Sequence, residues 1–244
     1  MFSLKRALPR PENGEAVMTL TGHLDELRSR LIHSLIAVVV CAIISYFFIE
    51  DITRVLTAPA GQLYFMKPAD AFFIYIKLLV AGGVVMSSPF LFYEFWAFLV
   101  PAFSPHGKKV LTLLTISSLS LFAFGGSLAF FFVVPKGLRF FLSFGESMAT
   151  PMISMSSYLN FVIMLVLPFG LVFNLPLILI FLAKMGIVNS EQMGRQRKYV
   201  IFGSFVASAV LTATTDVFTQ CLLALPMIIL YEISRLIIKY AFKK

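Results

Sequence analysis

Long apolar runs without any charged side chain constrain this chain more than any other feature. Residues 110–134 and 158–183 contain no Asp, Glu, Lys or Arg. An apolar run of about 20 residues or more spans the hydrocarbon core of a bilayer as an α-helix. The runs are continuous rather than alternating, which excludes a transmembrane β-barrel. With 59% hydrophobic and 13% charged residues, the composition predicts an all-α, polytopic membrane protein.

The apolar runs predict a single membrane domain of six transmembrane helices over residues 21–240, preceded by a flexible cytoplasmic arm at 1–20. The segment 21–30 is amphipathic at helical spacing and continues directly into the first span. The expected spans are residues 31–49, 72–100, 110–134, 158–183, 199–212 and 217–234.

The last apolar stretch decides the expected topology. A single long helix would place Arg195, Arg197 and Lys198 opposite the basic tail, whereas a hairpin of two short helices places both clusters on one side. On the hairpin topology, 15 of the 20 Lys and Arg residues lie on one side and 4 on the other, with Lys77 inside a span. Because basic residues favour the cytoplasmic side, we expect both termini in the cytoplasm.

The two helices of this hairpin are expected to be short, at about 14–15 apolar residues each, against the roughly 20 that a bilayer requires. Either neighbouring helices shield them, or the membrane thins around them. The sequence favours neither alternative.

A candidate binding site lies at the end of the second span. Glu94 lies inside the apolar run, and Phe98 follows one helical turn later on the same face. An ionisable group within a span is costly and by default indicates a functional site. A carboxylate below an exposed aromatic ring, beside a cytoplasmic loop, suggests a ligand that is both cationic and apolar. The alternative, a side chain that snorkels to the interface, carries equal weight.

Uncharged polar residues occur in the later spans. Asn174 lies two residues before Pro176, so its side chain either caps the carbonyl that the proline frees at Val172 or bonds to a partner helix. Thr212 and Gln220 are similar hydrogen-bonding groups around the last hairpin, and Asp216 is most simply the polar tip of its turn.

No motif indicates catalysis, a cofactor or a metal site, and the three histidines are too scattered to ligate an ion. A secondary transporter would usually carry ionisable residues at mid-bilayer and two repeated halves. This sequence has almost no charge at mid-bilayer and no internal repeat. The sequence therefore favours a binding protein that is not an enzyme. A small-solute permease and a purely structural scaffold remain the alternatives.

Several motifs together resemble one family. They are HLDELRSRL at 23–31, SPFLFYEFWAFLVPAFSPH at 88–106, FNLPLIL at 173–179, KMGIV at 184–188 and LTATTDVFTQCLLALP at 211–226. In this order they resemble the TatC family, the multi-spanning receptor of twin-arginine protein translocation.

The resemblance implies a receptor in the cytoplasmic (inner) membrane that binds twin-arginine signal peptides of folded proteins. It also implies recruitment of TatA- and TatB-type single-span partners, export driven by the proton-motive force, and a homo-oligomer among membrane lipids, without nucleic acid or cofactor. The positions that match signal-peptide binding are Glu26, Phe98, His23, Arg28, Arg30 and His106. Asp216 and Gln220 match family positions in the last hairpin, where partner helices dock, and Pro59 matches a family position in an outer loop. We assign Asn174 and Thr212 to partner-helix docking as well, as uncharged polar groups in or near the spans.

Two positions depart from the family pattern. Gly107 stands where the family usually has a second glutamate after the loop histidine, and Asn174 stands where it often has a glutamate. A pair of guanidinium groups needs carboxylates for bidentate bonds, and one acid serves two arginines poorly. We therefore hypothesise that Glu94 joins Glu26 to complete the arginine site.

Overall fold

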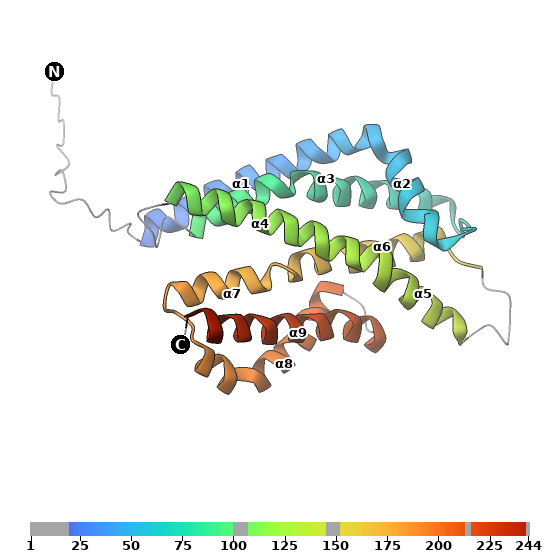
Figure 1. Cartoon of the computed structure of the whole chain (residues 1–244). Coiled ribbons are helices and arrows are strands. Elements are labelled where there is room, and N and C mark those ends of the chain that lie inside the picture. The colour runs from blue at the N-terminus through green and yellow to red at the C-terminus, as the bar shows by residue number, and fades with distance from the viewer. Residues whose placement is uncertain (1–19, 100–106, 145–151, 213–215, 243–244) are drawn as a thin grey trace, which may run out of the picture.

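The structure, a computed structural model, describes residues 20–99, 107–144, 152–212 and 216–242. These residues are almost entirely helical (Figure 1). Extended pairing within the described ranges is limited to one parallel bridge between Tyr64 and Ser154. The expected arm at 1–20 lies outside the described residues except for Leu20, which begins the first helix.

The helices follow one another with short connections. In chain order they are α1 (Leu20–Ser45), α2 (Ile49–Thr57), α3 (Pro68–Leu99), α4 (Gly107–Leu128), α5 (Val134–Ser143), α6 (Met155–Val172), α7 (Leu175–Lys184), α8 (Ser190–Thr212) and α9 (Val217–Phe242). Two 3₁₀ turns, Tyr46–Phe48 and Ala58–Ala60, flank α2, and a π-helical turn, Ala129–Val133, joins α4 to α5.

Five of the described helical segments are long and apolar enough to cross a membrane. They are Gly22–Ala60, Pro68–Leu99, Lys108–Ser143, Met155–Lys184 and Val217–Tyr240. Helix α8 is not among them, because Glu191, Arg195, Arg197 and Lys198 occupy its first half. The fold is therefore an all-helical membrane fold with five such segments and one further long helix.

The helices extend beyond the boundaries that hydropathy predicts. The expectation that the last two helices are short is wrong, since α8 has 23 residues and α9 has 26. Residues 50–57 and 135–143, expected in loops, are helical. Hydropathy marks only the apolar part of a helix, whereas backbone hydrogen bonding continues through polar turns. The expected span 158–183 is broken at Phe173 and Asn174, where α6 gives way to α7.

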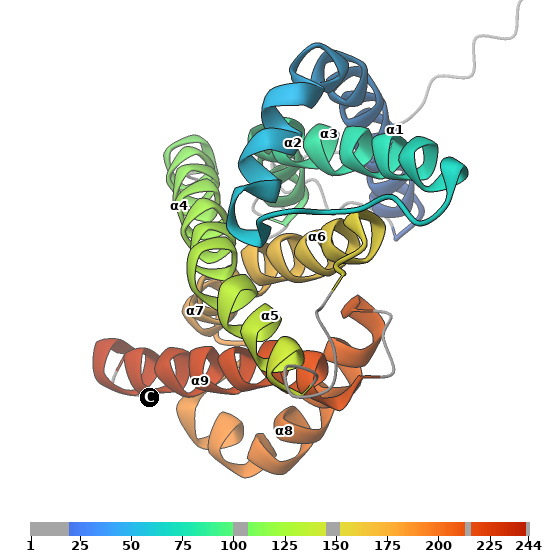
Figure 2. The same cartoon turned by 90° about the vertical axis from the view of Figure 1, so that its right-hand side faces the viewer.

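Helix α6 forms the centre of the molecule. It lies between α3 on one side and α9 on the other (Figure 2). Its side chains Leu159, Leu165 and Phe169 are fully buried, with no exposed surface. By contrast, α1 is the least buried of the five segments and lies along α3 at the edge of the bundle (Figure 1).

Glycines allow two of the helix contacts to be close. A Cβ atom at Gly83 of α3 would lie 2.8 Å from the backbone nitrogen of Ala42 in α1, and one at Gly125 of α4 would lie 2.8 Å from the Phe169 carbonyl oxygen in α6. Small residues commonly permit such approaches between membrane helices.

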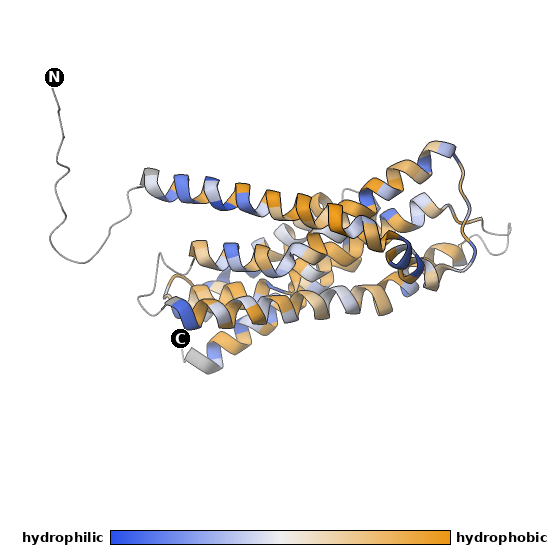
Figure 3. Ribbon diagram, turned by 90° about the horizontal axis from the view of Figure 1, so that it is seen from above, coloured by the Kyte–Doolittle hydropathy of each residue, from blue (hydrophilic) through white to orange (hydrophobic). Residues whose placement is uncertain are grey.

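Apolar residues are concentrated in the middle of the helices and polar residues at their ends (Figure 3). Many large apolar side chains are exposed on the outside, including Leu35, Val39 and Ile43 along α1. An apolar exterior between polar ends is the surface that a bilayer covers.

A candidate arginine-binding site between α1 and α3

Helix α3 is fixed so that Glu94 faces α1. Trp96 is fully buried, and its indole Nε1 donates a hydrogen bond of 2.7 Å to Ser118 Oγ of α4. Residues two positions apart point to nearly opposite sides of a helix. Anchoring Trp96 against α4 therefore directs the Glu94 carboxylate to the other side, toward α1.

Arg30 of α1 joins both candidate acids. Its Nε and Nη2 donate to Glu26 Oε1 at 2.9 and 2.7 Å, and its Nη1 donates to Glu94 Oε2 at 2.7 Å. The three side chains are only 13–23% exposed. Charge-assisted bonds of this length are among the strong hydrogen bonds of proteins. Two carboxylates around one guanidinium leave the cluster, which we call the Glu26–Arg30–Glu94 cluster, with one net negative charge.

Each carboxylate keeps one oxygen that Arg30 does not use. Glu26 Oε2 lies 3.9 Å from His23 Nδ1, and the described residues offer no hydrogen-bond donor to Glu94 Oε1. His23 in turn stacks on Phe98 with ring centroids 4.2 Å apart. A cavity of about 160 Å³ beside the cluster is lined by Leu27 and Leu31 of α1 and by Leu91 and Phe95 of α3, among others. Acidic oxygens thus adjoin an apolar surface.

The structure brings together most of the residues that the sequence assigns to this site. His23, Glu26, Arg30, Glu94 and Phe98 form one group. Arg28 is exposed and has no ion pair or hydrogen bond within the described residues. His106 lies outside the described residues, and Gly107 begins α4.

Sequence reasoning did not find the pairing of Arg30 with Glu94. Glu94 is ion-paired to an arginine 64 residues earlier in the chain. The spacing of Glu26 and Arg30 by four residues on one helix was the available signal. Nothing in the sequence shows that Glu94 lies against that same arginine.

The four residues expected to dock partner helices lie in two separate places in the structure. Asn174 is 4% exposed, and its Nδ2 donates to the Gly170 carbonyl at 3.0 Å, so the expectation that it caps the Val172 carbonyl is wrong. Its buried Oδ1 has no donor among the described residues. Asn174 also lines a cavity of about 370 Å³ together with Phe95 and Trp96.

Of the other three residues, Gln220 bonds between α8 and α9, whereas Thr212 bonds within α8 and Asp216 caps α9. Gln220 Nε2 of α9 donates to the Phe205 carbonyl of α8 at 2.8 Å, and Thr212 Oγ1 donates to the Ser208 carbonyl at 2.8 Å. Asp216 caps the start of α9 by accepting hydrogen bonds from Phe218 N at 3.3 Å and Thr219 N at 2.8 Å. It also accepts one from the Thr219 hydroxyl.

The hydrogen bonds that Asp216 accepts at the start of α9 determine its ionisation. Asp216 lies outside the spans. Burial alone would raise the pKa of this carboxyl, but the hydrogen bonds from Thr219 and Phe218 outweigh burial and lower the pKa below its usual value of 3.8. Asp216 is therefore a negatively charged cap at neutral pH.

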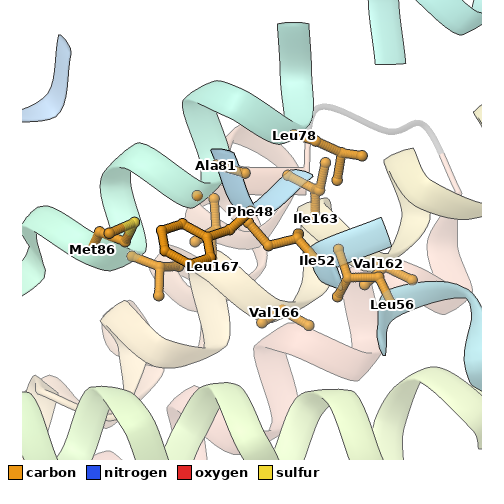
Figure 4. Close-up of a pocket in the computed structure, with 12 residues that line it drawn as sticks. Phe48, Ile52, Leu56, Leu78, Ala81, Met86, Val162, Ile163, Val166 and Leu167 are labelled. Atoms are coloured by element: carbon orange, nitrogen blue, oxygen red, sulfur yellow. The ribbon is translucent and has the colours of Figure 1, made fainter. Parts of the chain in front are cut away.

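The described residues also contain a wholly apolar cavity of about 520 Å³, away from the acidic cluster. Phe48, Ile52 and Leu56 line it from the α1–α2 side, and side chains of α3 and α6 complete it (Figure 4). Within the same ranges, no group of three or more His, Cys, Asp and Glu side chains is placed to hold a metal ion.

The fold and the site together define a class: a polytopic helical membrane protein with a partly buried acidic site where α1 and α3 meet. The family model described as Sec-independent protein translocase protein (TatC) matches residues 22–226. The chain belongs to the TatC family, a family of protein translocase components in membranes.

Relatives and solved structures agree with this assignment. The TatC protein of Desulforapulum autotrophicum is 42% identical over 88% of this chain and 82% of its own length. That of Aquifex aeolicus is 38% identical over 93% of this chain and 97% of its own. A crystal structure of the twin-arginine translocase receptor TatC superimposes with a TM-score of 0.83 at 38% identity, covering 90% of this chain and 99% of that one.

Proposed function

We propose that this protein is the signal-peptide receptor of a twin-arginine translocase, with the Glu26–Arg30–Glu94 cluster as the site that receives the paired arginines. The observation that carries the proposal is the net negative cluster beside Phe98 and an apolar cavity. The open oxygens on Glu26 and Glu94 accept a peptide guanidinium without displacement of Arg30. The apolar segment of the signal then continues along Leu91 and Phe95.

The net charge of the cluster limits how many signal arginines it can neutralise, and this makes the residue at position 107 important for peptide binding. One net negative charge neutralises one of the two signal arginines, and the second lacks the carboxylate that the family usually places at position 107. His23 and Phe98 flank the peptide in this proposal, with Arg28 nearby on α1, and His106, assigned to the same role by the sequence, lies outside the described residues.

The proposed topology has six membrane spans, with α8 as the fifth. The chain lies in the cytoplasmic (inner) membrane, and both termini are in the cytoplasm. TatA- and TatB-type helices dock at the α8–α9 hairpin, which Thr212, Asp216 and Gln220 hold in shape. Asn174 lines an adjoining cavity, and its buried Oδ1 has no donor among the described residues, which favours a bond from an inserted helix. Several copies of the chain assemble in the working complex.

Peptide affinity in detergent tests the site. A twin-arginine signal peptide is titrated against the purified chain, with a twin-lysine peptide as the matched control. Glu26→Gln and Glu94→Gln should each weaken arginine-peptide binding about tenfold or more, because each removes a charge-assisted acceptor. Gly107→Glu should restore most of the Glu94→Gln loss. Unchanged binding by both Gln variants would refute the proposed site.

Export of a twin-arginine reporter in cells lacking their own receptor tests the function as a whole. Export restored by this chain and abolished by Glu26→Gln separates a receptor from a small-solute permease and from a scaffold. A chain that restores no export, yet assembles in the membrane, would contradict the receptor role.

A further inference from the structure

A second polar site lies in the membrane domain, away from the acidic cluster. Lys77 of α3 donates a hydrogen bond from Nζ to Asn160 Oδ1 of α6 at 2.8 Å. The described residues supply no carboxylate as an ion-pair partner for Lys77, which is exposed on the outside of the bundle. The proposed receptor role uses neither residue.

The Lys77–Asn160 pair lies near the end of the bundle where α3 begins. Lys77 lies one helical turn after Phe73, and the exposed rings of Phe72, Phe73 and Tyr75 surround that level. Asn160 follows the start of α6 by five residues, about 7 Å along the axis. Aromatic rings mark the membrane interface, and a lysine one turn below them reaches the headgroups.

An apolar groove runs from the pair toward the bilayer centre. It is a cavity of about 300 Å³ between α3 and α6, lined below Lys77 and Asn160 by Val80, Val84, Met164 and Leu167, among others. From Lys77 to Val84 the groove extends about 10 Å, which fits within one leaflet of a core about 30 Å thick. It adjoins the larger apolar cavity of Figure 4, with which it shares Ala81, Ile163 and Leu167.

We propose that Lys77 and Asn160 bind the phosphate of an anionic phospholipid, with an acyl chain in the groove. An ammonium group has three donors, and the bond to Asn160 uses one of them. The Asn160 amide nitrogen adds two further donors that have no acceptor among the described residues. A cation with no acid beside it and an amide donor are the groups that hold a phosphate.

The depth of the groove favours a lipid over a partner helix with an acidic residue. A membrane-spanning helix crosses a hydrocarbon core about 30 Å thick, so a helix docked along its whole length would contact a surface of that length. The groove ends at Val84 and Leu167, and the apolar cavity that it adjoins reaches only Met86 on α3, so the two together fall short of that length.

Native mass spectrometry of the purified full chain tests the proposal. Delipidated protein is titrated with phosphatidylglycerol or with phosphatidylcholine of the same acyl chains. The parent should prefer phosphatidylglycerol. Lys77→Gln should lower that affinity about tenfold, as expected for the loss of one charged hydrogen bond, while Lys77→Arg should retain it. Lys67→Gln, an exposed lysine nearby in the chain, is the matched control and should bind as the parent does.

Further variants cover the case in which Lys77→Gln folds poorly. Val84→Trp fills the groove but leaves the Lys77–Asn160 pair intact, and it should weaken phosphatidylglycerol binding. Millimolar inorganic phosphate should not compete, because it lacks the acyl chain. Equal binding by the parent, Lys77→Gln and Val84→Trp would overturn the proposal, as would an equal loss in Lys67→Gln.

A photo-crosslinking residue in place of Met164 distinguishes the occupants in native membranes. An adduct of lipid mass that disappears on Lys77→Gln supports the proposal. A polypeptide adduct that disappears on the same substitution would overturn it in favour of a partner helix.

Discussion

At the scale of single residues, the chain neutralises costly groups with partners far away in the sequence. Arg30 bonds to Glu26 one turn earlier and to Glu94 on another helix. Asn174 differs, because its buried Oδ1 has no hydrogen-bond donor among the described residues. An unsatisfied buried group costs about 1–3 kcal/mol, so its retention marks a position where something other than the stability of the isolated chain matters.

The coupling of Arg30 to Glu94 is measurable. In a double-mutant cycle with Arg30→Gln and Glu94→Gln, unfolding in detergent should give a coupling free energy of about 1–3 kcal/mol. Each single variant leaves the other partly buried ion without this partner. Arg28→Gln is the matched control and should shift stability by less than about 0.5 kcal/mol. Additive single-variant effects would show that the pair contributes nothing to stability.

The Asp216 cap gives a pH dependence. Asp216→Ala should destabilise the protein by about 1 kcal/mol at pH 7, since α9 loses its N-cap. Because the folded-state pKa is lowered below 3.8, this charged contribution is fully present above that pH and disappears as the pH falls through the folded pKa. Thermal unfolding across pH 7 to 3 measures the difference between parent and variant. A difference that grows on acidification would contradict the assignment.

At the scale of helices, contacts depend on where small residues lie. Gly83 brings α3 against the backbone of α1, and the pair carries the acidic cluster at its end. The π-helical turn Ala129–Val133 joins α4 to α5 with no break in the helix. A glycine such as Gly83 therefore determines where two helices can approach each other closely.

Gly83→Ala should lower the stability of the protein by about 1–3 kcal/mol, because the added methyl group overlaps the backbone of Ala42 and Val38 at 2.8 Å. Gly203→Ala in α8 is the control, since a Cβ there meets nothing within 4 Å. That control should be neutral or gain up to about 1 kcal/mol from helix propensity. Thermal unfolding in detergent compares them, and equal effects would refute the close contact.

At the scale of the whole molecule, polar helix ends and an apolar exterior define one membrane layer. The acidic cluster and the Lys77–Asn160 pair lie toward opposite ends of α3. The proposed peptide site and the proposed lipid site therefore lie toward opposite ends of one helix.

Cysteine labelling tests the proposed topology. In a chain with Cys41 and Cys221 replaced by Ala, single cysteines at Gln62 and Ser143 should react with an impermeant maleimide from outside intact cells. Cysteines at Ser29 and Arg195 should react only after the membrane is permeabilised. Labelling of Arg195→Cys from outside would place the start of α8 on the other side and exclude six spans.

The sequence by itself determined the fold class, the membrane setting and the family, because long uncharged runs and local motifs are properties of contiguous residues. It also indicated Glu94 and Phe98, since an acid in a span and helical spacing are visible in one dimension, and Glu26 through the family resemblance. Only the tertiary structure decided that Arg30 holds both acids, that Asn174 bonds back to Gly170, and that Lys77 meets Asn160. The Arg30 and Lys77 pairings join residues 64 and 83 positions apart, and no local pattern specifies which helix faces meet.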